Sequence, residues 1–476
     1  MEHPSRSLDD LPTPKRLPLI GNAHQLGKPV RSHLLFEKWA EELGPIYRVD
    51  FGPLHSVVVV SDADALGELL LARPDTFQRS HRLRKLLEEL YREPTGVFIA
   101  EGEVWKRQRK LVMAVLNRNN LGRYYQLIHR SGERLHRRFE AAARTGRVLD
   151  MGHEFNLYAS DVAGALALGQ DLNALEAGDN EFRQLYLESL DRVISRMFMP
   201  ITYWRWGIKL PADRRAERAT AKILDALHDF IEQGRARVAA RPELIEKPES
   251  LLDALLAEQH KSGEISDEDI MGNMSALMSA GQDSTANTLT WAVAELANVP
   301  RVQEKLSQEA REVIGDTGFP QDHTIIDQMP YAQAVLKETI RLRSAGPTTV
   351  ADAMVDTTLA GVRLPAGTEI VMLTRFATRD RQPDEAEFRP ERWLDDGPKP
   401  PKTLAFGGGP RFCPGRNLAF LEAQSVLAMI ARDYEIHLDP TAPPIEEELH
   451  FAMAPSLVRA TLKPRKHARQ PAPQPV

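Results

Sequence analysis

The sequence predicts a mainly α-helical protein with a few small β-sheets. Apolar residues recur at helical spacing almost without interruption over residues 80–297. Segments with strand character are few and short. Residues 47–51 and 56–61 are expected to pair as a hairpin, and a second β region is expected within residues 350–373. In that second region, residues 359–367 have the glycine and proline content of tight turns.

The chain has 476 residues and shows no internal repeat and no obvious linker. We therefore expect one large domain over residues 12–463, long enough to bury a core and still enclose a cofactor. Residues 1–11 are expected to be a flexible N-terminus. Residues 464–476 are basic and rich in proline, which predicts a disordered tail.

Composition excludes several classes of protein. The formal net charge of -6 argues against a nucleic-acid-binding surface over the whole molecule. A single cysteine excludes intramolecular disulfides and sites built from several cysteines. The first residues are charged and carry no apolar run, so we expect neither a signal peptide nor a transmembrane anchor. The expected location is the cytoplasm.

One helix should dominate the core. It is expected to begin at the capping box of Ser266 and Asp269 and to run to about Asn298. A polar block, residues 280–285, interrupts its apolar middle. This block is either a polar site within a core helix or a helix break, in which Gly281 ends one helix and Asp283 caps the next.

The only cysteine, Cys413, lies in a loop of unusual composition, residues 406–415, that leads into a helix. Three successive glycines allow the backbone to turn tightly beside a planar ligand. The amides and dipole of the following helix, with Arg411 and Arg416, favour a thiolate. From the residues alone, Cys413 is an inert buried thiol, a catalytic nucleophile or a ligand for a soft metal.

Two other segments of the sequence each place a pair of polar or aromatic residues on one face of an expected helix. Glu338 and Arg341 are three residues apart and share a helix face, and so do Trp105 and Arg109 at a spacing of four. Taken alone, the first is an ordinary surface ion pair and the second part of a solvated basic helix.

The loop resembles the haem-binding signature of the cytochrome P-450 superfamily, and the resemblance extends over roughly residues 12–463. The matching positions are Phe406, Gly409, Arg411, Cys413 and Gly415. By this resemblance the fold is that of the superfamily, with haem b between the long central helix and the helix after the cysteine. Cys413 is then the axial iron ligand, and Phe406, Gly407, Arg411 and Gly415 cradle the haem.

The resemblance also gives roles to the other motifs. Trp105 and Arg109 correspond to residues that face the haem propionates, and Ala280 and Gly281 to the oxygen-binding segment. The residues that would relay protons to dioxygen are Asp283, Ser284 and Thr285, although most members carry Thr at the position of Ser284. The triad that corresponds to the family's buried structural network is Glu338, Arg341 and Arg392. Many members have a basic residue in the segment that matches residues 347–353, and this sequence has none there.

The implied function is that of a soluble, bacterial-type haem-thiolate monooxygenase without a fused reductase. It would insert one oxygen atom of dioxygen into a C–H or C=C bond of a lipophilic molecule such as a terpenoid, steroid, fatty acid or polyketide. A separate ferredoxin or flavodoxin, with its reductase, would dock on the basic face near Lys106, Arg107 and Lys110. The alternatives are a peroxide-driven peroxygenase or an isomerase on the same haem, and a non-catalytic haem sensor.

Overall fold

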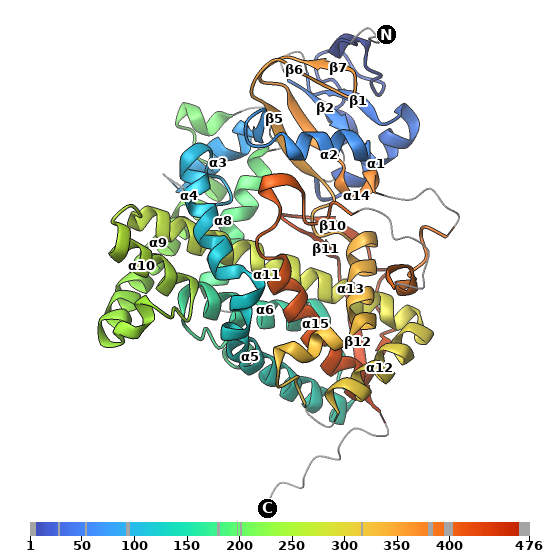
Figure 1. Ribbon diagram of the computed structural model, residues 1–476. Helices are drawn as coiled ribbons and strands as arrows, with labels where there is room; N and C mark the ends of the chain where they lie inside the picture. Colours follow the sequence, from blue (N-terminus) through green and yellow to red (C-terminus); the bar gives the residue numbers. More distant parts are fainter. Residues whose placement is uncertain are drawn as a thin grey trace, which may run out of the picture.

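The computed structural model describes residues 6–26, 29–52, 55–91, 96–178, 181–197, 199, 202–315, 318–378, 384–394 and 403–465. The predicted helical character is confirmed (Figure 1). The helices are α1 (Ser32–Leu43), α2 (Ala63–Leu71), α3 (His81–Tyr91), α4 (Gly102–Leu116), α5 (Arg118–Thr145), α6 (Met151–Leu168), α7 (Ala174–Ala177), α8 (Glu181–Met197), α9 (Pro211–Ala240), α10 (Leu251–Ser262), α11 (Asp267–Asn298), α12 (Pro300–Ile314), α13 (Pro330–Leu342), α14 (Thr374–Ala377) and α15 (Arg416–Asp433).

The strands form small sheets. The largest has the order β1-β2-β8-β5-β3 and lies at the N-terminal end of the molecule, beside α1 and α2 (Figure 1). The other sheets are β6-β7, β10-β11 and β4-β12-β9. The strand bounds are β1 (Ile46–Asp50), β2 (Ser56–Val60), β3 (Phe77–Arg79), β4 (Leu149–Asp150), β5 (Thr349–Ala353), β6 (Thr357–Leu359), β7 (Val362–Leu364), β8 (Glu369–Met372), β9 (Tyr434–Leu438), β10 (Glu447–Leu449), β11 (Met453–Pro455) and β12 (Arg459–Pro464).

The predicted β regions agree with these strands. β1 and β2 pair antiparallel as the expected hairpin, and the region of residues 350–373 holds β5 to β8, with a tight hairpin between β6 and β7. The short strands β3 and β4 carry too few residues to show a pattern. The sequence did not single out the strands after residue 433 either.

Helix α11 begins and ends where the sequence places it. The Ser266 hydroxyl accepts from the Asp269 amide, and the Asp269 carboxylate accepts from the Ser266 amide. The helix continues through residues 280–285, so a helix break at Gly281 is excluded. Figure 1 shows α11 crossing the centre of the molecule, where it contacts α6 and α15.

Residues 6–11, expected to be part of a flexible N-terminus, contact the rest of the fold. The Arg6 amide donates to the Gly361 carbonyl, the Arg6 carbonyl accepts from the Arg363 amide, and Leu11 is buried in the core beside the main sheet. The ordered chain therefore begins before residue 12. Residues 1–5 of that terminus and residues 466–476 of the expected tail lie outside the described residues. Within the described part of the chain, no helix combines the length and the hydropathy needed to cross a membrane.

Candidate haem site

The loop before α15 holds Cys413 through its own backbone. The Cys413 amide donates to the Phe406 carbonyl over 2.8 Å, and the Phe412 amide donates to the Gly409 carbonyl over 3.2 Å. Gly407 has φ 69° and Gly409 has φ 61°, so the loop requires left-handed backbone at both positions. The Phe406 ring packs on that of Phe420 in α15, with centroids 5.6 Å apart.

Gly409 has a second reason to lack a side chain. A Cβ atom there would lie 2.1 Å from the Leu70 carbonyl oxygen of α2, whereas a Cβ atom on Gly407 would meet nothing within 4 Å. The glycine run was expected to let a planar ligand approach. The structure shows that Gly409 instead admits the backbone of α2.

The Cys413 thiol lies in a mixed environment. Burial raises its pKa, while the Gly415 and Arg416 amides and the charges of Arg109 and Arg416 lower it to a smaller extent. The sequence shows the amides and charges that lower the pKa of the thiol, and these favour a thiolate. It does not show the burial, which raises the pKa and has the larger effect. A metal ion overcomes this burial, because a coordinated thiol loses its proton outright.

The predicted propionate residues meet at this loop. Arg109 of α4 donates to the Phe412 carbonyl over 2.6 Å, and its guanidinium lies 4.7 Å from the centre of the Phe412 ring. Trp105, one turn earlier, lies under the Arg411 guanidinium at 4.3 Å. Residues from two distant parts of the sequence thus form one cationic, aromatic surface beside Cys413.

Two further arginines, missed by the sequence analysis, extend this surface. Arg73, Arg79 and Arg411 surround one carboxylate, Glu101, with which Arg411 forms an ion pair. Buried nitrogens of all three arginines have no hydrogen-bond partner among the described residues. Burial, together with repulsion from Arg73 and Arg411, lowers the pKa of Arg79 to about 9. We name these three arginines and Glu101 the arginine cluster.

This imbalance fits a dianionic ligand. Buried guanidinium groups need hydrogen-bonding anions, and planar carboxylates match them best. Haem b carries two propionates, so the arginine cluster and Cys413 together suit it. Arg79 of β3 pairs directly with Ala351 of β5, the strand in which the sequence lacks the usual basic residue. Arg79 is therefore a candidate for the role that the missing basic residue has in other members.

The polar block of α11 combines exposed and buried positions. Ala280 is exposed although it sits in the middle of a core helix, while Gln282 and Thr285 are buried. The Ser284 hydroxyl donates back to the Ala280 carbonyl over 2.6 Å, a bond that loosens the helix locally. A Cβ atom on Gly281 would make only ordinary contacts, with Leu277 at 3.9 Å and with Ala163 of α6 at 4.0 Å, so no close approach requires a glycine here.

The Glu338 network is confirmed and is larger than predicted. Glu338 is fully buried and accepts two hydrogen bonds from Arg341 and one from Arg392, each at 2.8 Å. The indole of Trp393 and the amide of Arg389, which the sequence did not indicate, also donate to it, at 2.8 and 3.1 Å. Both oxygens of the carboxylate are therefore satisfied.

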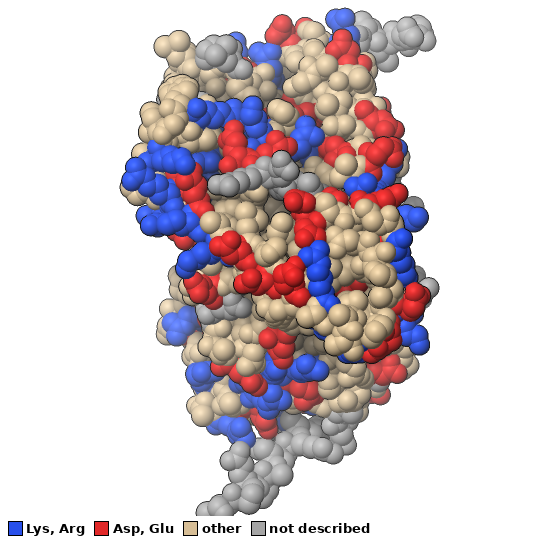
Figure 2. All heavy atoms as spheres, turned by 90° about the vertical axis from the view of Figure 1, so that its left-hand side faces the viewer, with Lys and Arg blue, Asp and Glu red and all other residues tan. Residues whose placement is uncertain are grey.

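The expected basic docking face is weaker than the sequence suggests. Lys106 is paired with Glu103 over 2.7 Å, and Arg107 lies 3.4 Å from Asp269 of α11. Lys110 is exposed. On the face that Figure 2 turns to the viewer, Lys and Arg are interspersed with Asp and Glu and form no field of one sign.

A mainly apolar pocket of about 440 Å³ adjoins the polar block of α11. One wall is the α11 face from Met271 to Ser279, one turn before Asp283. We call this cavity the distal pocket. Its other walls come from α3, the loop before α4, α8 and α9, and include Leu87, Phe98, Ile99, Tyr186 and Leu224. The volume is typical of sites for small molecules.

The fold and the site define a haem-thiolate protein. A family model described as cytochrome P-450 matches residues 11–462, and the chain belongs to this family. The human mitochondrial 25-hydroxyvitamin D-1 alpha hydroxylase is 30% identical over 94% of this chain and 91% of its own. The chloroplastic protein LUTEIN DEFICIENT 5 of Arabidopsis thaliana is 28% identical over 85% and 69%. The cytochrome P-450 monooxygenase sphH of Aspergillus fumigatus is 26% identical over 93% and 85%.

These comparisons establish a haem b-dependent monooxygenase of the oxidoreductase class that takes electrons from a redox partner. They do not support the narrower expectation of a bacterial type, since these relatives are eukaryotic proteins and two of them carry organellar names. Among the described residues, no group of three or more His, Cys, Asp and Glu side chains is placed to hold a metal ion. Cys413, in the loop that its amide closes on the Phe406 carbonyl, is the candidate ligand of the haem iron.

Proposed function

We propose that this protein inserts one oxygen atom of dioxygen into a C–H or C=C bond of a lipophilic small molecule. The observation that carries the proposal is the distal pocket, an apolar cavity that ends within one turn of Asp283. Its walls suit a terpenoid, steroid, fatty acid or polyketide. A separate ferredoxin or flavodoxin would supply the electrons, and the single cysteine suits a reducing compartment such as the cytoplasm.

When bound, haem b supplies the binding and activation of dioxygen. Cys413 would hold the iron, and the arginine cluster with Trp105 and Arg109 would hold the propionates. The residues of α11 would handle protons: the Asp283 carboxylate would take part in the relay, and so would the Ser284 hydroxyl, which donates to the Ala280 carbonyl. The apolar walls of the distal pocket exclude water from the reacting bond.

The acid and the hydroxyl at residues 283 and 284 favour dioxygen over peroxide as the oxidant, because peroxide already carries the protons that such a relay delivers. They also argue against a haem sensor, which needs no proton delivery.

The test is oxygen labelling in the purified holoprotein with a surrogate ferredoxin and its reductase. Geraniol, progesterone and lauric acid are first screened for a shift of the haem Soret band, and binders are then turned over under ¹⁸O₂. The proposal predicts one ¹⁸O atom per product molecule and a loss of about 100-fold in rate for Asp283→Asn. Activity with peroxide alone that is unaffected by Asp283→Asn would favour a peroxygenase. Ligand binding without any product would favour a sensor.

A further inference from the structure

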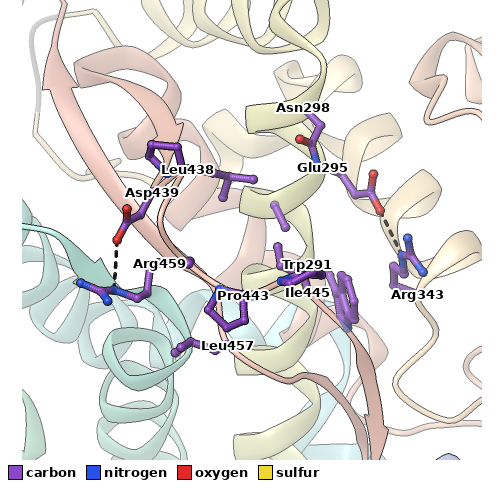
Figure 3. Close-up of a pocket in the computed structure, with 14 residues that line it drawn as sticks. Trp291, Glu295, Asn298, Arg343, Leu438, Asp439, Pro443, Ile445, Leu457 and Arg459 are labelled. Atoms are coloured by element: carbon purple, nitrogen blue, oxygen red, sulfur yellow. Dashed lines mark hydrogen bonds and ion pairs between the residues drawn. The ribbon is translucent and has the colours of Figure 1, made fainter.

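The distal pocket and a second cavity of the same size, about 440 Å³, differ in the polar groups that line them. The second cavity lies at the C-terminal half of α11 and is lined by ions that are paired with one another (Figure 3). Arg343 pairs with Glu295 over 3.0 Å, and Arg459 pairs with Asp439 over 3.3 Å. In the distal pocket, the more buried polar groups are hydroxyls, which can bind a ligand without breaking an ion pair.

Three of these hydroxyls come together at the α11 wall of the distal pocket. Ser275 and Ser279 are one turn apart and share a helix face with Asp283, which follows one turn later. Tyr186 of α8 lies against this face, and its hydroxyl is hydrogen-bonded to both serines. All three side chains are partly exposed and line the pocket, so they form one polar patch in a mainly apolar cavity. We call them the hydroxyl patch.

The hydroxyl patch is uncharged at neutral pH. Burial, with the nearby Tyr91 and Asp283, raises the pKa of Tyr186, and the serine hydroxyls do not ionise in this range. A neutral hydroxyl both donates and accepts, and its hydrogen rotates to suit a partner. An alcohol group of a ligand also donates and accepts, so it can join the patch whichever way the hydrogens point.

The charged groups of the distal pocket disfavour an anionic ligand. The described residues that line the pocket include no Lys or Arg, whereas Asp225 of α9 and Glu268 of α11 contribute carboxylates. Both carboxylates are on exposed residues, as is the imidazole of His228. A ligand carboxylate would therefore meet like charges, with no guanidinium or ammonium group to receive it. A neutral polar group that is hydrogen-bonded costs less to bury.

We propose that the distal pocket selects a neutral, largely apolar molecule with an alcohol group, and that Tyr186, Ser275 and Ser279 bind this alcohol. The inference rests on the proposed function and narrows its substrate class. An isoprenoid or steroid alcohol fits the pocket, and a free fatty acid does not. Tyr186 determines this specificity because it brings a hydroxyl from α8 to the serines of α11.

The test is equilibrium dialysis of the ferric holoprotein with tritiated farnesol, an isoprenoid alcohol. Unlabelled farnesene and farnesoic acid compete with it; they share its carbon skeleton and carry no oxygen or a carboxylate. Tyr186→Phe keeps the ring and removes only the hydroxyl. Tyr125→Phe, which removes a hydroxyl that donates to the Pro320 carbonyl away from the pocket, is the matched control. Ala276→Trp fills the cavity and tests whether farnesol binds there.

We expect farnesol to bind at least about fivefold more tightly than either competitor. Tyr186→Phe should weaken farnesol binding about fivefold and remove its advantage over farnesene, whereas Tyr125→Phe should leave both unchanged. Ala276→Trp should abolish farnesol binding. Tighter binding of farnesoic acid than of farnesol, equal farnesol affinity in wild type and Tyr186→Phe, or undiminished binding by Ala276→Trp would each overturn the proposal.

This binding experiment is independent of turnover, because it needs neither dioxygen nor electrons. A preference for the alcohol that depends on Tyr186, without any oxygenated product, would contradict the proposed function and support the inference. An ¹⁸O-labelled product without such a preference would support the proposed function and overturn the inference. An unchanged carbon monoxide spectrum in each variant shows that the haem site is intact.

Discussion

The molecule holds two clusters of buried charge, and their charges are balanced in opposite ways. At Glu338, one carboxylate is shared by Arg341 and Arg392 and is satisfied by further donors. In the arginine cluster, the single carboxylate of Glu101 serves three guanidinium groups whose buried nitrogens are left without partners. The first cluster is complete within the protein and is structural. The second is not complete among the described residues, which suits an anionic ligand.

A buried carboxyl group, that of Glu422, offers a comparison with the buried arginines. Glu422 of α15 is buried with no cation beside it among the described residues, and burial raises its pKa to about 8. A carboxyl group can thus stay neutral by keeping its proton. The pKa of Arg79, about 9, still leaves its guanidinium charged at neutral pH. Protonation therefore removes the charge of Glu422, whereas Arg79 keeps its charge and suits an anionic partner.

The largest effect is expected at Glu338. Glu338→Ala leaves two buried guanidinium groups without their carboxylate and should lower the free energy of unfolding by about 3–5 kcal/mol. Urea unfolding of the holoprotein measures this loss. Glu42→Gln, which breaks the exposed pair with Lys38, is the control and should change stability by less than about 0.5 kcal/mol. A similar change in both variants would show that the Glu338 network is not structural.

A smaller effect, on haem retention, is expected at Arg79. Arg79→Met removes a donor for the haem and also a buried charge, so it should speed haem loss about tenfold with little loss of protein stability. Haem transfer to apomyoglobin measures the rate, and urea unfolding measures stability. Arg84→Met, in the nearby α3 and outside the cluster, is the control. Equal haem loss from both variants would contradict the role given to the arginine cluster.

The smallest effect is a pH dependence at Glu422. Between pH 4.5 and 8 the folded state holds a proton that the unfolded state has released, so stability falls as the pH rises through this window. From pH 6 to 7.5 the loss should be at most about 2 kcal/mol. Glu422→Gln should flatten this part of the curve, measured by urea unfolding at several pH values. A variant with the wild-type slope would mean that Glu422 is ionised when folded.

The sequence could predict features whose signals are local. The capping box of Ser266, the spacing of Glu338 and Arg341, and the residues around Cys413 each lie within one short segment, and the structure places them as expected. It could not predict Arg79, because its role depends on the pairing of β3 with β5, more than 270 residues away. The same holds for Trp393, which reaches Glu338 only through the folded chain.

Charge on the surface was the least predictable property. Lys106 and Arg107 suggest a basic face in the sequence, but Glu103 and Asp269 neutralise them in the fold. The pKa of the free Cys413 thiol shows a related limit, because the sequence shows the neighbouring charges and not the burial that opposes them.

The most direct test of the central claim is the difference spectrum of the dithionite-reduced protein with and without carbon monoxide. If Cys413 is the axial ligand, the wild type shows the red-shifted Soret band of a thiolate-bound complex, and Cys413→Ala loses it. A band typical of histidine ligation in the wild type, or the same red-shifted band in Cys413→Ala, would contradict the assignment of Cys413 and the site built around it.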